Sequence, residues 1–419
     1  MTTQSWTARP GKTPRPGNRR TLAILGAFCL FLSTIEYLIP KPVPFMRIGI
    51  ANLPLMLALD ILPFGEFVLL TLIKVAGQGI VTGTLFSYIL LFSLTGTFVS
   101  ALSMYALRRL LGTRLASMAG ISALGALLSN GAQLALARLF VFGPSVRYIL
   151  PPFLAMGVIT GTGLGLFCER FIGKSRWYAR ETSPRPAEDG GSEKTGTAAA
   201  AADRSNRGEG TWEKFRRKRQ DRYERIFSAR DLCAAGLLMM PALVFNPNPS
   251  ARFLQFLFFS LLLWFAGKKN NVLITIAVML SIVAFNLLAP YGQALFSIGT
   301  FRLTRGALMS GLQRAATLEG LIMLSRFSIR RDLRLPGAFG ELIGESFRIL
   351  ASIQERRNAV SRKNFAAGVD ALMLELSQTE EPPAAASSGE LRRGSSAAGR
   401  IILTAAVILS WLPVVISRQ

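Results

Sequence analysis

The sequence predicts an all-α, polytopic membrane helical bundle, and three properties of its composition lead to this prediction. Half of the 419 residues are hydrophobic, only 17% are charged, and the mean hydropathy is +0.37. An average soluble chain carries roughly 25% charged residues. The formal net charge is nevertheless +24, from 48 basic and 24 acidic residues. This balance argues against a disordered chain and against a nucleic-acid partner, and it suits apolar spans joined by basic loops.

Apolar segments long enough to cross a bilayer, about 20 residues each, dominate the first part of the chain. Six candidates occur at 22–40, 48–63, 64–82, 84–107, 115–142 and 148–168. Asn52 and Pro54 interrupt the second candidate, and only Pro63 and Gly65 separate it from the third. We therefore predict a basic tail over 1–20 and a six-span membrane domain over 21–173.

The rest of the chain alternates between polar and apolar character. Residues 174–230 predict a flexible linker that ends in a basic amphipathic helix at 212–230. A second unit over 231–378 contains spans at 232–247, 251–267 and 271–289, a deep or crossing segment at 306–324, and charged amphipathic helices at 337–356 and 359–377. A linker at 379–400 precedes a last span within 401–419.

Basic clusters predict the orientation of the spans. The N-terminal tail holds five arginines and lysines and no acid, and Arg108, Arg109 and Arg114 follow the fourth span. Lys268 and Lys269 follow the eighth span. Because basic loops stay in the cytoplasm, we predict a multi-pass protein of the inner (plasma) membrane with a cytoplasmic N-terminus and basic loops near anionic lipid.

The chain lacks the residues that several kinds of enzyme require for catalysis or phosphate binding. There is no histidine, and the three cysteines are far apart. Gly173-Lys174-Ser175 has no glycine five residues before it, as a phosphate-binding loop requires, and the aspartates are scattered rather than clustered for magnesium. A Ser–Lys pair stays open. We predict no catalytic residue, no metal and no cofactor.

Polar residues inside the predicted spans are the candidates for a solute site. An ionisable group at bilayer depth costs at least ~2.5 kcal/mol on insertion scales, so it needs a partner or a function. The candidates for substrate binding are Asn52, Lys74, Gln78, Asn130 and Gln133. The alternative for them is hydrogen bonding between helices. For Glu36, Asp60 and Arg138 that structural role is favoured.

Four short motifs carry a resemblance. Residues 46–54 (MRIGIANLP), 74–78 (KVAGQ), 86–88 (FSY) and 129–133 (SNGAQ) resemble the Gx transporter family, which is also catalogued as heptaprenyl diphosphate synthase component I. The resemblance covers about 20–173. This family is similar to the solute-binding S components of energy-coupling factor (ECF) transporters, which take up vitamins or other small solutes. In S components a small-xxx-small pair in the first helix docks the coupling subunit, and Ala23 and Ala27 match that pair.

The second unit, about 228–378, more faintly resembles the coupling T component of the same transporters. That resemblance implies separate ATP-binding-cassette ATPase subunits as partners, contacted by short arginine motifs. The matching residues are Arg356, Arg357 and Arg362, with 325–327 (SRF) and 329–331 (IRR) as second choices. The usual Ala-Arg-Gly form is absent, and the alternative is that these arginines only keep a cytoplasmic helix soluble.

The sequence thus predicts a fusion of an S-like and a T-like module in an importer. One alternative is a membrane component of heptaprenyl diphosphate synthesis or of precursor uptake. The other is a membrane scaffold that transports nothing.

Overall fold

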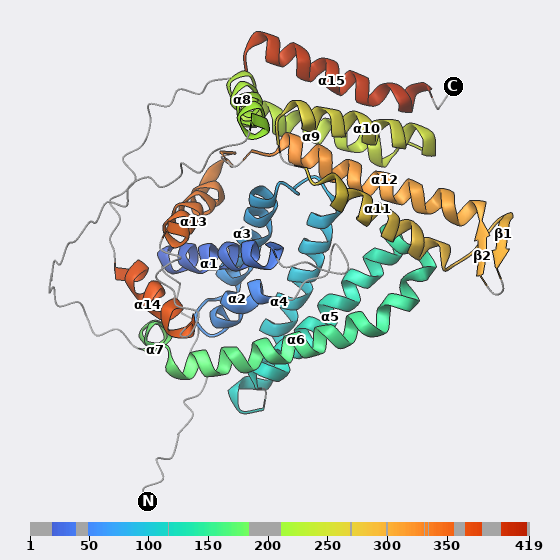
Figure 1. The fold of residues 1–419 in the computed structure, drawn as a ribbon. Helices are drawn as coiled ribbons and strands as arrows, with labels where there is room; N and C mark the ends of the chain where they lie inside the picture. The colour runs from blue at the N-terminus through green and yellow to red at the C-terminus, as the bar shows by residue number, and fades with distance from the viewer. Residues whose placement is uncertain are drawn as a thin grey trace, which may run out of the picture.

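The structure confirms the all-α prediction. The computed structural model describes residues 19–38, 49–115, 117–183, 211–268, 270–298, 301–330, 332–333, 335–355, 365–378 and 395–416. Nearly all of these residues are helical, and Figure 1 shows two groups of helices packed against each other. We call α1–α7 the N-terminal bundle and α8–α15 the C-terminal half, although α13 and α14 lie beside α1 and α7 and share their core.

The N-terminal bundle contains most of the predicted spans. Its elements are α1 (Arg19–Leu38), η1 (Ile50–Asn52), α2 (Leu53–Ala58), α3 (Phe64–Thr82), α4 (Tyr88–Leu115), α5 (Met118–Ala137), the π-helical turn η2 (Arg138–Phe142), η3 (Gly143–Ser145), α6 (Val146–Lys174) and α7 (Arg176–Thr182). The predicted span at 48–63 differs, because its helical part is only the short η1 and α2. Pro54 has no backbone N–H to donate, so it starts a new helix after Asn52 instead of continuing one.

The helices of the C-terminal half lie near their predicted positions, but α9, α10 and α11, predicted as spans, have only 16, 17 and 16 residues, and one hairpin is added. Its elements are α8 (Thr211–Ile226), α9 (Ala229–Val244), α10 (Pro249–Phe265), α11 (Val272–Leu287), β1 (Ala294–Ile298), β2 (Phe301–Thr304), α12 (Arg305–Ser328), α13 (Gly337–Glu355), α14 (Phe365–Gln378) and α15 (Ala397–Ile416). The antiparallel hairpin β1–β2 was not predicted. It closes the connection between α11 and α12, at the right-hand edge of Figure 1.

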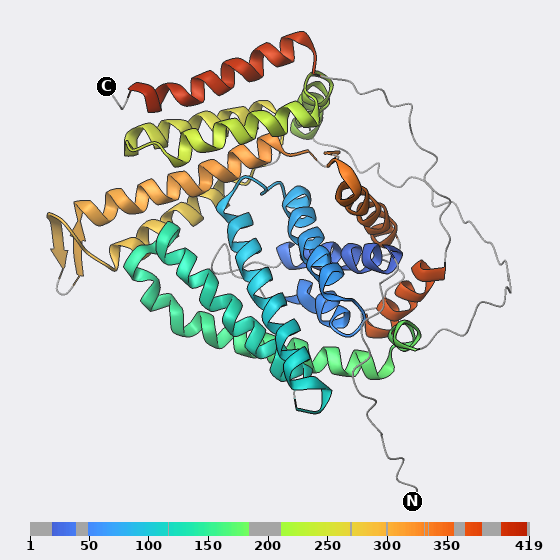
Figure 2. The ribbon, with the colours of Figure 1, turned by 180° about the vertical axis from the view of Figure 1, so that it is seen from behind.

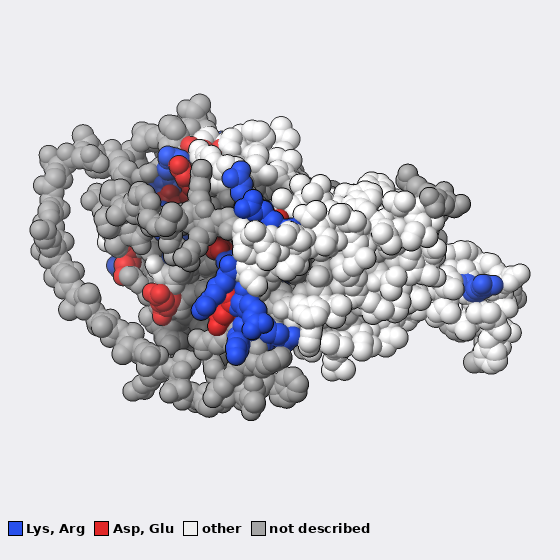
Figure 3. All heavy atoms as spheres, turned by 90° about the horizontal axis from the view of Figure 1, so that it is seen from above, with Lys and Arg blue, Asp and Glu red and all other residues white. Residues whose placement is uncertain are grey.

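The protein is a multi-pass membrane protein by the length and composition of its helices. Five described helical segments are long and apolar enough to cross a bilayer: Phe64–Thr82, Tyr88–Gly112, Met118–Phe140, Gly143–Lys174 and Ala397–Ile416. A sixth is possible if α8 and α9, bent by 88°, form one broken span. On the face of the molecule seen in Figure 3, the visible charged side chains gather mainly at one end, and a long uncharged surface separates them from one basic side chain at the other end.

The two groups of helices run in different directions. In Figures 1 and 2, α9, α10, α12 and α15 lie alongside one another, whereas α3 and α4 run across that direction. Within the N-terminal bundle, α5 and α6 approach closely at Gly161 and Gly165. A Cβ on Gly165 would lie 2.4 Å from the Ala119 backbone, so only glycine permits this packing.

Helix α1 lies against the C-terminal half through α13. A Cβ on Gly26 would lie 2.8 Å from the Ser346 hydroxyl oxygen of α13. Ala23 and Ala27, predicted to dock a coupling subunit, are completely buried in this helix. Their docking role stays a prediction, but the small residues of α1 do sit beside a close helix–helix approach.

A second contact joins the halves near η2. The Asn286 side-chain amide of α11 donates to the Val141 backbone carbonyl at 3.0 Å, and Arg314 of α12 donates to the Asn286 side-chain oxygen Oδ1 at 3.1 Å. Nearby, the Phe86 backbone N–H donates to the Ser325 hydroxyl at 3.0 Å. These directional bonds fix how the C-terminal half sits on the bundle.

Candidate functional site

A polar cavity lies inside the N-terminal bundle. The space between atoms at this site is about 440 Å³, a volume that includes space open to solvent. Helices α1, α3, α4, α5 and α6 and the η1 turn all contribute. The lining residues are Glu36, Gly49, Ala51, Asn52, Lys74, Gly96, Thr97, Ala126, Ser129, Asn130, Gln133, Gly157 and Thr160. Four of the five predicted substrate-binding residues therefore meet at one cavity.

Lys74 and Asn52 form one wall. Lys74 projects from the middle of α3 with only 2% of its surface exposed, and its ammonium donates to the Asn52 side-chain oxygen. Asn52 is held at the junction of η1 and α2, just after Gly49 turns the chain with a φ of 90°. A buried ammonium is costly unless it is hydrogen-bonded, so this contact belongs to the site as well as to the fold.

Glu36 brings a carboxylate to the same cavity, near the end of α1. Its two oxygens accept the backbone N–H groups of Gly49 at 3.2 Å and Ala51 at 3.3 Å. These bonds hold the η1 turn against α1 and so position Asn52. The sequence favoured a purely structural role for Glu36. Its place as the only acid in an apolar span was the one indication that it also belongs to the polar site.

Two amides of α5 form the opposite wall. The Asn130 amide donates to the Phe153 carbonyl of α6 at 2.9 Å, and the Gln133 amide donates to the Ser129 hydroxyl at 3.0 Å. Each amide lies directly over a glycine. A Cβ on Gly157 would be 2.3 Å from the Asn130 nitrogen, and one on Gly96 would be 2.4 Å from the Gln133 nitrogen.

Gln133 has an unmet hydrogen-bonding need. The residue is only 1% exposed, so its side-chain oxygen is shielded from solvent. This oxygen accepts no hydrogen bond from any described residue. Leaving a buried acceptor unpaired costs about 1–3 kcal/mol, so native proteins rarely tolerate it without a water or a ligand. A molecule with an N–H or O–H group inside the cavity would satisfy this oxygen.

The remaining predicted site residues have different surroundings. Gln78 lies one turn beyond Lys74 on α3 and does not line the cavity. Arg356, Arg357 and Arg362 lie outside the described residues. Among the second-choice arginines, Arg326 donates to Asn270 at 3.2 Å and Arg330 donates to the carbonyls of Glu224 and Phe227 at the end of α8.

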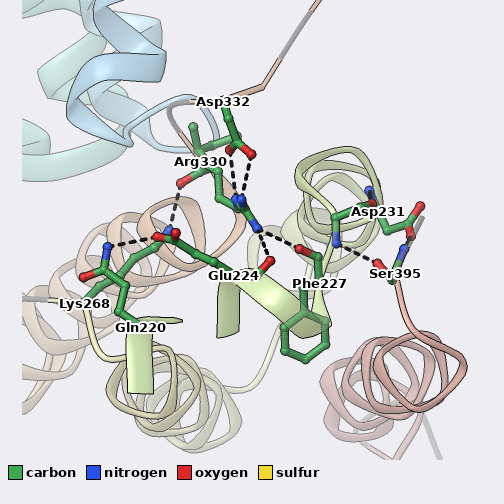
Figure 4. A network of polar contacts seen from close by, with 10 residues as sticks. Gln220, Glu224, Phe227, Asp231, Lys268, Arg330, Asp332 and Ser395 are labelled. Carbon is green, nitrogen blue, oxygen red and sulfur yellow. Dashed lines mark hydrogen bonds and ion pairs between the residues drawn. The ribbon is translucent and has the colours of Figure 1, made fainter. Parts of the chain in front are cut away.

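Arg330 belongs to a polar network where α8, α10 and α12 end (Figure 4). Lys268 donates to three carbonyls at the end of α12, those of Arg326 at 2.5 Å, Phe327 at 3.3 Å and Ile329 at 2.8 Å. Burial, and secondly the nearby Arg330 guanidinium, lower the pKa of Lys268 to about 8. In the same view the Ser395 backbone N–H donates to the Asp231 carboxylate at 3.2 Å.

The fold and the cavity together define a multi-pass membrane protein with a polar cavity inside its N-terminal bundle. Residues 25–171, which run from α1 to α6, match the family model described as heptaprenyl diphosphate synthase component I. Residues 229–331, from α9 to α12, match a domain of unknown function, DUF8519. No curated protein and no solved structure matches the chain.

Proposed function

We propose that this protein is the membrane-embedded, solute-binding and coupling subunit of an ECF-type importer. The observation that carries the proposal is the polar cavity, whose lining includes Lys74, Asn52 and Glu36 together with Gln133, the side-chain oxygen of which accepts no hydrogen bond from the described residues. A chain that only spans the membrane has little reason to gather a cation, a carboxylate and three amides around one space, because each is costly there.

The lining favours a small, polar solute. Among the described lining residues the polar side chains are amides, hydroxyls, one ammonium and one carboxylate, and none of these lining residues is aromatic. The solute carries at least one N–H or O–H group for Gln133 and an acceptor for the Lys74–Asn52 wall.

Energy would come from separate ATPase subunits, since we propose that this chain catalyses no reaction itself. The C-terminal half would receive their motion through Arg356, Arg357 and Arg362 on the cytoplasmic side of the plasma membrane. The crossed directions of α3 and α4 relative to α9 and α10 suit a bundle that tilts as a rigid body to expose its cavity (Figures 1 and 2).

Co-purification tests this coupling. The full chain with Arg356→Glu and Arg357→Glu, expressed beside its native ATPase subunits, is expected to lose them because charge reversal creates repulsion at the contact. Arg348→Glu, on the neighbouring helix α13, is the matched charge control. Undiminished recovery of the ATPase subunits with the double variant would refute the assignment of these arginines.

The family description favours a second candidate, a membrane component of heptaprenyl diphosphate synthesis. Under that function the chain would recover a soluble prenyl synthase subunit in the same co-purification, and the cavity would take an isoprenoid precursor. Recovery of that subunit in place of ATPases would favour the second candidate over the importer.

A further inference from the structure

Helices α7 and α14, distant in sequence, are joined by one carboxylate. Asp370 of α14 accepts the Ser175 hydroxyl at 2.5 Å and the Trp177 backbone N–H at 3.1 Å through one oxygen. Its other oxygen accepts the Arg176 backbone N–H at 3.0 Å. Asp370 thus caps the first turn of α7 from another helix, satisfying amides that a helix start leaves unpaired.

Helix α7 is in turn hydrogen-bonded to Asp60, just after α2, within the N-terminal bundle. The Tyr178 hydroxyl donates to Asp60 at 3.1 Å, and Asp60 also receives both arms of the Arg108 guanidinium at 2.9 and 2.7 Å. Trp177 is fully buried beside them. A bidentate Arg–carboxylate pair is short and directional, so it fixes the position of the turn that carries Asp60.

That turn leads directly to the cavity. Asp60 lies two residues beyond α2, and Asn52, at the other end of this short helix, accepts the Lys74 ammonium inside the cavity. Every residue of α2 is buried, so the helix moves as one packed piece. A displacement of Asp60 is therefore transmitted to Asn52.

The C-terminal end of α14 is hydrogen-bonded to α1. The Arg20 guanidinium of α1 donates to the Leu376 carbonyl at 3.2 and 2.8 Å, in the last turn of α14. In sequence, α14 follows directly after the segment that contains Arg356, Arg357 and Arg362. It is thus the first described element beyond the arginines assigned to ATPase coupling.

We propose that Asp370 and Tyr178 are positioning residues that connect α14 to the solute cavity through α7, Asp60 and α2. When α14 shifts, the first turn of α7 loses its bonds to Asp370 and keeps only its own Ser175 cap, Tyr178 leaves Asp60, and α2 no longer holds Asn52 against Lys74. The hydrogen bonds along this route are present whether or not the protein is a transporter. That the route serves transport rests on the proposed function.

Two of the three native cysteines lie near this route, and the third can serve as a reference. Cys168 is buried and close enough to Asp60 and Arg108 to interact with their charges, and Cys29 is buried within charge-interaction range of Lys74. Cys233, partly exposed on α9, lies in the C-terminal half and serves as an internal reference. The rate at which a maleimide labels each thiol, followed by mass spectrometry of the full chain, measures how often each region opens.

Asp370→Ala and Tyr178→Phe are each expected to speed the labelling of Cys168 and Cys29 about tenfold, because a hydrogen bond to a charged group is lost in both. Cys233 labelling stays constant. Tyr178→Phe removes one hydroxyl and leaves the α7 cap intact, so it tests the route even if Asp370→Ala unfolds α7. Glu341→Gln, which removes a carboxylate from an exposed ion pair on α13, is the matched control and changes nothing.

Three results would overturn the link. Unchanged labelling of Cys168 in Tyr178→Phe would mean that Asp60 is held without α7. Faster labelling of Cys168 with unchanged Cys29 would mean that the route ends before the cavity. Equal acceleration of all three thiols would indicate general loosening. None of these measurements uses a solute or an ATPase, so their failure is distinct from failure of the proposed importer.

Discussion

At the scale of single residues, the cavity depends on two amides that lie over two glycines. Asn130 covers Gly157 and Gln133 covers Gly96, with no space for a methyl group between them. Gly163, on the same helix as Gly157, faces open space. Gly157 and Gly163 therefore form a matched pair: an alanine would clash at Gly157 and has room at Gly163.

Gly157→Ala is expected to displace the Asn130 amide, break its bond to the Phe153 carbonyl and narrow the cavity. Overpacking of this kind costs roughly 1–3 kcal/mol. Gly163→Ala is expected to leave stability unchanged or slightly higher, since alanine favours helix. Thermal unfolding of the purified variants compares the two, and equal unfolding midpoints would contradict the close approach at Gly157.

Gln133 and Gln255 form a second matched pair, because both are almost fully buried. Gln255 bonds to Asn246, to the Ala242 carbonyl and to the Ser410 carbonyl, so Gln255→Met is expected to cost about 3 kcal/mol. Gln133→Met removes one bond together with an unpaired oxygen, so its stability should change by less than about 1 kcal/mol. Denaturation curves separate the two, and a larger loss from Gln133→Met would show that its oxygen is already satisfied.

At the scale of elements, the polar network at the end of α12 gives a pH dependence. The pKa of Lys268 lies at about 8 in the folded protein and near 10.5 when unfolded. Between these values the unfolded chain binds more protons, so raising the pH favours the fold. From pH 8 to 10 the native protein should gain up to about 3 kcal/mol relative to Lys268→Met.

Unfolding of the native protein, Lys268→Met and Lys218→Met across that pH range measures this gain. Lys218, exposed on α8, controls for loss of a lysine as such. The Lys218→Met profile should run parallel to that of the native protein, and the Lys268→Met profile should diverge from both. If the Lys268→Met profile also ran parallel, the account of Lys268 would be wrong.

The elements were largely predictable, and the exceptions have physical reasons. Apolar runs bounded by charge or proline predicted α3 to the residue, because length and hydropathy determine a span. The shortening of the 48–63 segment followed from Pro54, but the turn before α2 depends on the distant Glu36. The glycines at 96 and 157 could not be recognised, because their role requires knowing which helix lies opposite.

At the scale of the whole molecule, several separate contacts hold the halves together, and two of them are far apart. Helix α1 packs on α13 near Gly26 and Ser346, and Asn286 holds the Val141 carbonyl at the other contact. Both contacts lie in described elements on either side of residues 184–210. We therefore expect the halves to stay associated when the chain between them is cut.

A protease site inserted within 184–210 tests this expectation. After cleavage, the fragment bearing α1–α7 should co-purify with the fragment bearing α8–α15, since the contacts are intact. Asn286→Leu with Gly26→Leu, which disrupts these two contacts and leaves those of Ser325, Asp370 and Arg20 in place, should weaken the association of the fragments and lower their co-recovery. Separation of the unmodified fragments would mean that the halves depend on their covalent connection.

The central claim is that the cavity holds a small polar solute. The most direct measurement is mass analysis of small molecules released from the purified full chain and its variants. We predict a polar compound released from the native protein, Gly163→Ala and the folded fraction of Gln255→Met, and lost from Gln133→Met and Gly157→Ala. Release of nothing from the native protein, or of the same compound from every variant, would contradict the claim.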